Sequence, residues 1–97
     1  MSRHDIVFKF ALSWSAKPQR LTVPKGALPV RLGVQNGVPC LWALVESWQD
    51  EEEELEIIKV GTGHPIPAGR WTHLATEIVD DDEFVWHFFG RQVKADE

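Results

Sequence analysis

The chain has 97 residues, of which 43% are hydrophobic, and it carries a formal net charge of −5 and one cysteine. A chain of this length forms one domain, because it is too short for a second hydrophobic core. The single Cys40 excludes an internal disulfide, and no segment approaches the roughly 18 apolar residues of a membrane span. The first residues also lack the apolar run of a signal peptide. We therefore expect one domain over residues 1–97, in the cytoplasm and away from membranes.

The acidic residues are concentrated in two runs. The run at 50–56 holds six acids and the run at 80–83 holds four, which leaves five of the 15 acids elsewhere. All 10 lysines and arginines lie outside these runs, so the rest of the chain has an excess of positive charge. A protein that is acidic as a whole can therefore still present a cationic surface to an anion.

Apolar residues alternate with a period of two in almost every segment, which favours strands over helices. In chain order the expected strands are 6–12, 20–23, 30–35, 38–46, 55–60, 71–79 and 84–89. We expect an acidic loop at about 49–54, because adjacent like charges repel in a strand, and a flexible tail at about 91–97. Seven short strands predict an all-β fold, either a small antiparallel sandwich or a partly open barrel.

Asn36-Gly37 predicts a two-residue hairpin turn, because both central positions of such a turn need a positive φ. The turn fixes the register, which places Arg31 opposite Trp42 on one face, beside Gly33. An arginine next to an indole, near a glycine that leaves space, suits a flat anionic ligand. The other face is predicted to be wholly apolar, with the pairs Val34–Pro39, Leu32–Leu41 and Val30–Ala43.

Three further expectations concern individual strands. Pro39 has no N–H to donate, so we expect an unpaired edge at its level. Segment 84–89 is apolar on both faces, which favours a central strand covered on two sides. In segment 71–79 the residues expected to point inward are Thr72, Leu74, Thr76 and Ile78.

A glycine-rich turn follows the strand expected at 55–60. In Gly61-Thr62-Gly63-His64, two residues without a Cβ allow backbone N–H groups to turn toward an anion, and the threonine hydroxyl can donate as well. The alternative is a plain turn that ends the strand. Arg70 lies close behind and is followed by Trp71.

Catalytic signals in the sequence are poor. The four histidines, His4, His64, His73 and His87, are too far apart for a local metal motif. Ser13 and Ser15 lack the surroundings of a nucleophile. We expect no enzymatic activity, no metal and no cofactor.

Three segments together resemble a widespread family of small phage and prophage proteins. They are QNGVPCLWALV at 35–45, GTGHPI at 61–66 and VWHFF at 85–89, and TVPKGA at 22–27 also fits the pattern. The resemblance covers about residues 6–89. The acidic insertion at 50–56 departs from the family pattern, which puts the role of that segment in doubt.

The family is similar to phage sponge proteins that sequester the nucleotide messengers of bacterial defence. The resemblance implies an anti-defence protein that binds a cyclic nucleotide or a cyclic ADP-ribose-type messenger without hydrolysing it. It would act in the cytoplasm of the infected host as a homo-oligomer, with no direct nucleic-acid binding. Two alternatives remain open: an acidic nucleic-acid mimic that blocks a host defence protein, and a virion-associated structural protein.

The residues expected to bind the ligand fall into three roles. Arginines would bind phosphates, tryptophans would stack on bases, and polar side chains would read the ligand's edges. The candidates are Arg31, Gln35, Asn36, Trp42, Thr62, His64, Arg70, Trp71 and Trp86.

Overall fold

The computed structural model describes residues 4–81 and 83–93. This part of the chain contains no helix that could span a membrane. Its seven strands are β1 (Ile6–Ala11), β2 (Gln19–Pro24), β3 (Leu28–Gln35), β4 (Val38–Val45), β5 (Glu52–Gly61), β6 (Thr72–Val79) and β7 (Phe84–Val93).

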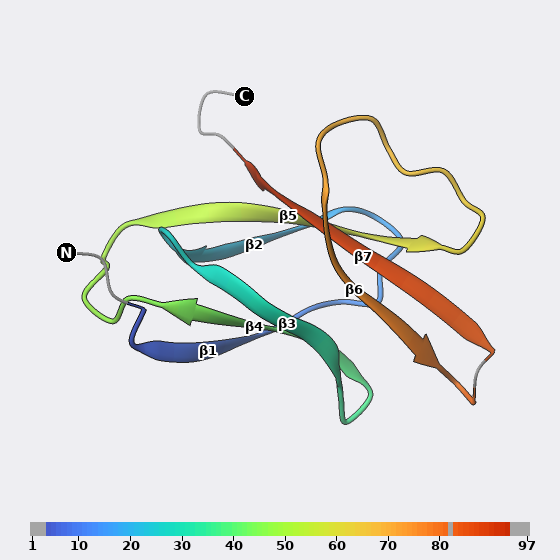
Figure 1. The fold of residues 1–97 in the computed structure, drawn as a ribbon, viewed down its shortest axis with the longest axis horizontal. Helices are drawn as coiled ribbons and strands as arrows, with labels where there is room; N and C mark the ends of the chain where they lie inside the picture. Colours follow the sequence, from blue (N-terminus) through green and yellow to red (C-terminus); the bar gives the residue numbers. More distant parts are fainter. Residues whose placement is uncertain (1–3, 82, 94–97) are drawn as a thin grey trace.

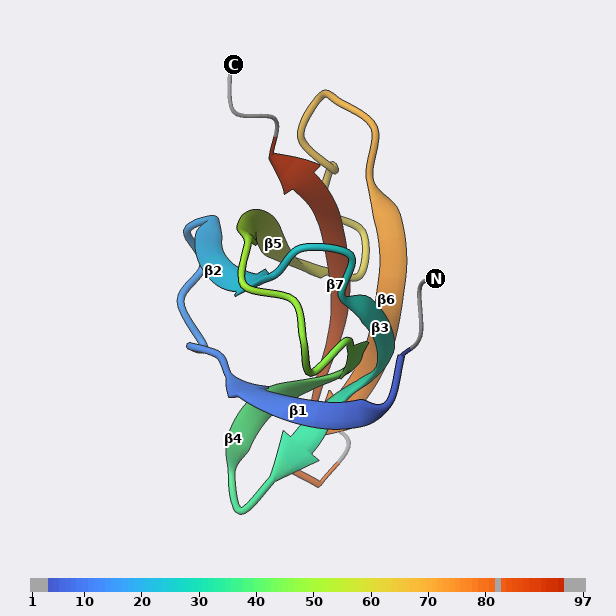
Figure 2. The ribbon, with the colours of Figure 1, turned by 90° about the vertical axis from the view of Figure 1, so that its left-hand side faces the viewer.

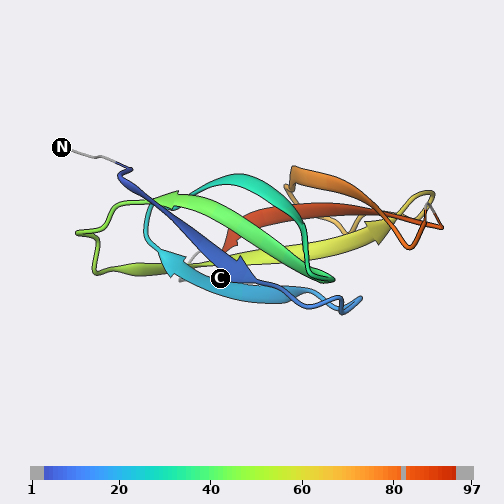
Figure 3. The same ribbon diagram turned by 90° about the horizontal axis from the view of Figure 1, so that it is seen from below.

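The strands form two antiparallel sheets, which confirms the predicted all-β fold. One sheet has the order β1-β4-β3 and the other has the order β2-β5-β7-β6 (Figures 1 and 2). Neither sheet closes on itself, so the architecture is a sandwich and not a barrel. The molecule is flat, with principal extents of 44 × 32 × 18 Å, and Figure 3 shows this thin outline.

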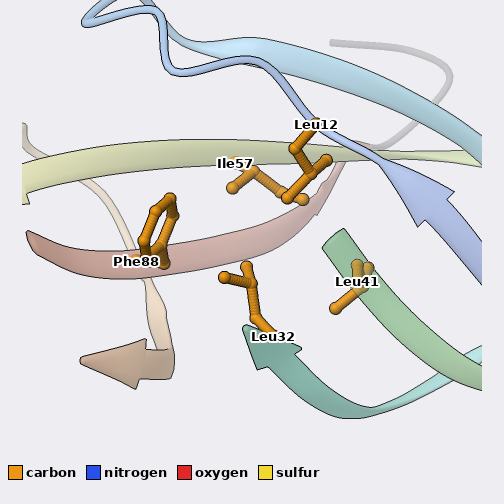
Figure 4. Close-up of a cluster of buried hydrophobic side chains, with 5 residues drawn as sticks. All are labelled: Leu12, Leu32, Leu41, Ile57 and Phe88. Carbon is orange, nitrogen blue, oxygen red and sulfur yellow. The ribbon is translucent and has the colours of Figure 1, made fainter. Parts of the chain in front are cut away.

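The core lies between the two sheets. Leu32 and Leu41 from the three-stranded sheet meet Ile57 and Phe88 from the four-stranded sheet, and Leu12 closes one side (Figure 4). Burying each of these side chains contributes about 1.5–3 kcal/mol. The faces of β3 and β4 that turn away from this cluster are thereby fixed as the outer surface.

The β3–β4 hairpin forms at the predicted turn. Asn36 and Gly37 both have positive φ, at 53° and 77°. The predicted pairs hold from Gln35–Val38 back to Arg31–Trp42. The predicted pairing of Val30 with Ala43 is wrong, because a bulge shifts the register and brings Pro29 opposite Ala43 instead.

The open edge expected at Pro39 is also wrong, since β4 is the central strand of its sheet. β1 pairs with β4 only as far as Cys40. Beyond that point, the Leu12 N–H donates to the carbonyl oxygen of Pro39 at 2.8 Å. Pro39 takes part in this contact through its carbonyl oxygen, which does not require the N–H that proline lacks.

The acidic loop expected at 49–54 is shorter than predicted, because residues 52–54 belong to β5. Strand β5 pairs with β2 on one side and with β7 on the other. Cross-strand cations offset the repulsion between its carboxylates: Arg20 Nη1 lies 3.6 Å from Glu54 Oε1, and Arg91 Nη2 lies 2.8 Å from Glu56 Oε1. The cross-strand pairing of β5 therefore outweighs the repulsion between its neighbouring carboxylates.

The tail predicted at 91–97 is partly wrong as well. Strand β7 continues through Val93 and pairs there with Glu54. Residues 94–97 lie outside the described part of the chain.

A bulge between His73 and Ala75 in β6 reverses the side-chain alternation there. Leu74 packs against the core as predicted. Thr76 and Ile78 face outward, contrary to prediction, and Ile78 is 61% exposed. Strand β7 is central, but Phe88 on its inner face is fully buried while Phe89 on its outer face is only half-buried.

Candidate functional site

A row of three residues crosses the outer face of the three-stranded sheet. Trp42 on β4 pairs with Lys9 on β1 and with Arg31 on β3. We call these three residues the cationic row. Both cations are exposed and the indole is half-buried. The row therefore places one cationic residue on each strand that neighbours Trp42, on the face turned away from the core.

Gly33 determines where the guanidinium of Arg31 lies. A Cβ at this position would lie 3.0 Å from Arg31 Nε and 3.3 Å from its Nη2. The guanidinium therefore rests on the bare backbone of Gly33, where a larger residue would displace it. The space that the sequence analysis assigned to a ligand beside Gly33 is thus occupied by the Arg31 side chain itself.

Gln35 connects to the row from the end of β3. Lys9 Nζ donates to Gln35 Oε1 at 3.1 Å. A hollow of about 300 Å³ is lined by Arg31, Val34, Gln35 and Trp42. Three of the predicted binding residues thus line one hollow, and Lys9, which sequence reasoning missed, contacts one of them, Gln35.

Cys40 lies beneath this group of side chains. Its partner across the hairpin is Gly33, so its side chain belongs to the outer face, yet it is only 2% exposed. The contact between Lys9 and Gln35 runs diagonally over its position in the sheet. Asn36, also a predicted site residue, is an exposed member of the turn itself.

A second group of predicted residues gathers where β5 ends. Thr62, His64 and Trp86 line a hollow of about 490 Å³. Gly61 lies against two of them: a Cβ there would be in ordinary van der Waals contact, 3.4 Å from His64 Cδ2 and 3.5 Å from Trp86 Cζ3. The Thr62 hydroxyl is hydrogen-bonded to His87 Nε2 at 2.7 Å.

A larger cleft of about 550 Å³ lies on the inner side of Trp86. The Lys59 ammonium lies 4.0 Å from the ring centroid of Trp86 and 5.5 Å from that of Trp14. It donates to the Trp14 carbonyl oxygen, and the Trp14 indole N–H donates to the Gly37 carbonyl oxygen at 2.8 Å. Burial lowers the pKa of Lys59. Lys59 therefore ties the segment between β1 and β2 to the four-stranded sheet.

Sequence reasoning missed both Lys59 and Trp14. Lys59 has the same parity as the buried Ile57 in β5, so strict alternation already places its side chain on the inner face. Val34 on the edge strand β3 lines both the Lys59 cleft and the hollow of the cationic row. The two spaces nevertheless open on opposite faces of the β1-β4-β3 sheet.

Arg70 and Trp71 lie apart from both groups. The guanidinium of Arg91 lies 4.2 Å from the ring centroid of Trp71. The Trp71 indole N–H donates to the carbonyl oxygen of Pro67 at 3.0 Å. The next residue, Thr72, pairs with Gly90, four residues along β7 from Trp86. At about 3.3 Å per residue, Trp71 and Trp86 are too far apart to hold one base between them.

A chain of hydrogen bonds crosses the outer face of the four-stranded sheet. Thr76 Oγ1 lies 2.9 Å from His87 Nδ1 and 2.9 Å from His73 Nε2. Both ring nitrogens of His87 are thus hydrogen-bonded to threonine hydroxyls, Nδ1 to Thr76 and Nε2 to Thr62. Within residues 4–81 and 83–93, no three His, Cys, Asp or Glu side chains are grouped closely enough to hold a metal ion.

The chain is thus a small two-sheet β-sandwich with hollows at its surface and between its sheets. The chain belongs to the family described as Domain of unknown function (DUF7352), whose model matches residues 4–97. No curated protein matches the chain, and no solved structure does.

Proposed function

We propose that this protein binds a cyclic nucleotide or a cyclic ADP-ribose-type messenger and sequesters it without hydrolysis, as a phage anti-defence protein in the cytoplasm of the infected host. The cationic row is the observation that carries the proposal. Lys9 and Arg31 occupy the strand positions on either side of the half-buried Trp42, and the hollow that Arg31 and Trp42 line has no acidic residue in its lining. A planar base and a phosphate are the groups that such a surface attracts.

The energetics of the row suit tight binding. Stacking of one base on Trp42 contributes about 1–3 kcal/mol. Charge-assisted hydrogen bonds from Arg31 and Lys9 to phosphate oxygens contribute about 1.5–3 kcal/mol each. Gly33 positions the guanidinium, and Gln35 holds the lysine, so less side-chain entropy is lost on binding.

The chemistry of the row favours retention over turnover. Arginine stays protonated at any physiological pH, and lysine donates hydrogen bonds only. The row contains no histidine or carboxylate to take up a proton, and the indole and the amide are not nucleophiles. We propose binding without catalysis for this reason.

The nucleic-acid mimic is the less well supported alternative. A mimic needs free carboxylates, whereas three of the four acids of β5 contact other residues of the fold. Glu54 pairs with Arg20, Glu56 pairs with Arg91, and Glu53 accepts from the backbone N–H of Gly26 at 3.2 Å. The acidic strand thus contributes to sheet pairing rather than to a phosphate-like array.

We further propose that the sponge is a homo-oligomer. Next to the cationic row, the outer face carries Val7, Leu44 and Leu28 side by side on β1, β4 and β3. Val7 is 52% exposed and Leu28 is 51% exposed. An apolar strip of this kind is one that a second copy could cover, and the molar mass in solution tests it.

The test is retention of an intact compound. The protein is incubated with cyclic dinucleotides, cyclic trinucleotides and cyclic ADP-ribose isomers, washed and denatured, and the released compound is identified by mass spectrometry. The double variant Lys9→Ala/Arg31→Ala is expected to lose the compound, while Lys17→Ala/Arg20→Ala, with the same charge change elsewhere, keeps it. A chemically altered compound, no retained compound, or equal retention by both variants would contradict the proposal.

A further inference from the structure

The orientation of the Gln35 amide is fixed by its neighbour. Lys9 Nζ lies 3.1 Å from Gln35 Oε1. An ammonium group donates hydrogen bonds and cannot accept them, so the oxygen of the amide must face Lys9. The amide NH₂ group therefore points away from Lys9. The usual ambiguity between the two ends of a glutamine side chain does not arise here.

Gln35 differs chemically from the other polar groups of the hollow. Arg31 and Lys9 only donate hydrogen bonds, and the Trp42 indole has a single N–H. Gln35 offers a donor and an acceptor side by side. Its carbonyl oxygen has two lone pairs, of which Lys9 uses one. Among the residues that line this hollow, Gln35 alone can both donate to a ligand and accept from it.

We propose that Gln35 reads the base of the sequestered messenger and that this base is adenine; the inference rests on the function proposed above. Adenine presents an N6 amino donor next to the N7 acceptor, which is the complement of a glutamine amide. Guanine presents two acceptors, O6 and N7, on the same edge, and O6 would face the Gln35 oxygen. The hollow therefore favours adenine over guanine.

The remaining groups complete the arrangement. Trp42 lines the same hollow and supplies the stacking surface. Arg31 and the two N–H bonds of Lys9 that Gln35 does not use are left for phosphate oxygens. Lys9 already orients the Gln35 amide before the ligand binds. Binding therefore costs less side-chain conformational entropy at Gln35.

Comparison of matched ligands on the unchanged protein is the first test. We expect cyclic di-AMP to bind at least about tenfold more tightly than cyclic di-GMP. The cyclic di-AMP analogue that carries 7-deazaadenine lacks the N7 acceptor and is expected to lose about tenfold in affinity. Equal binding of the two dinucleotides, or full affinity of the 7-deaza analogue, would overturn the adenine assignment while leaving sequestration intact. Failure to retain any cyclic nucleotide would instead count against the proposed function.

Two variants complete the test. Gln35→Glu keeps the shape and the contact with Lys9 but removes the donor to N7, so we expect about tenfold weaker binding of cyclic di-AMP. Gln49→Glu adds the same charge in the β4–β5 connection and is expected to bind as the unchanged protein does. Thermal unfolding of both variants shows whether the fold is kept. Undiminished binding by a folded Gln35→Glu protein would refute the role of Gln35.

Discussion

Arg31 and Trp42 lie directly opposite each other on β3 and β4, with both side chains on the face turned away from the core. The first prediction concerns this pair. Trp42→Ala is expected to abolish ligand retention, with a loss of about 1–3 kcal/mol of stacking energy, while the fold is kept. Calorimetric titration with the retained compound measures the loss. Trp48→Ala is the matched control, because Trp48 is 59% exposed and lies outside the hollow. Unfolding of Trp42→Ala would assign the ring to the stability of the sheet instead.

The second prediction separates binding from stability at Gly33. An alanine here places its Cβ 3.0 Å from Arg31 Nε and pushes the guanidinium off the backbone. Ligand affinity is expected to fall by about 1 kcal/mol. Stability is expected to be unchanged or to rise by up to about 1 kcal/mol, because alanine restricts the unfolded chain more than glycine does. Parallel titration and thermal unfolding check both values, and equal affinity would show that Arg31 adapts without loss.

The third prediction concerns the core. Phe88→Ala is expected to destabilise the protein by about 3–5 kcal/mol, because Phe88 is fully buried between the sheets and its removal leaves a cavity. Phe84→Ala removes the same group from a residue that is 47% exposed, so it should lower the free energy of unfolding clearly less than Phe88→Ala does. Urea denaturation of both variants gives the comparison. Similar losses would place the core elsewhere.

The fourth prediction concerns pH and Lys59. Burial lowers the pKa of Lys59 in the folded protein below the reference value of 10.5. Between these two pKa values the unfolded chain binds more protons than the folded chain, so the contribution of Lys59 to stability rises with pH in that window. Below the folded pKa, both states are charged and the full desolvation cost is present.

Lys59→Met lacks this titration and serves as the reference. The difference in unfolding free energy, unchanged protein minus variant, should therefore increase as the pH is raised toward 10.5. Denaturant titrations over that range measure it. A difference that stays constant or decreases would mean that the contacts with Trp14 and Trp86 stabilise the ammonium more than burial destabilises it.

The parts of the fold that local chemistry determines could be predicted from the sequence. The turn at Asn36-Gly37 fixes the pairing of Arg31 with Trp42, because a two-residue loop allows one register. The bulge after Pro29 breaks that register, and no residue type in this segment predicts a bulge. The same holds for the bulge in β6, which turned Thr76 outward.

The site was predictable only where its residues come from one hairpin. Arg31, Gln35 and Trp42 belong to β3 and β4, so the turn alone brings them together. Lys9 comes from β1, and its pairing with β4 depends on contacts far along the chain. The acidic strand was missed for a related reason. The cations that neutralise it, Arg20 and Arg91, lie more than 30 residues away from their partners.

Cys40 gives this surface a chemical reporter of its own. Its sulfur is the only one from a cysteine in the chain, the residue is 2% exposed, and the contact between Lys9 and Gln35 crosses its position in the sheet. A small thiol reagent can therefore reach it only when the side chains around it move apart. The rate of alkylation therefore reports how often these side chains move apart. A bound compound that restricts this motion would slow the reaction, and no added dye or tag is needed to measure it.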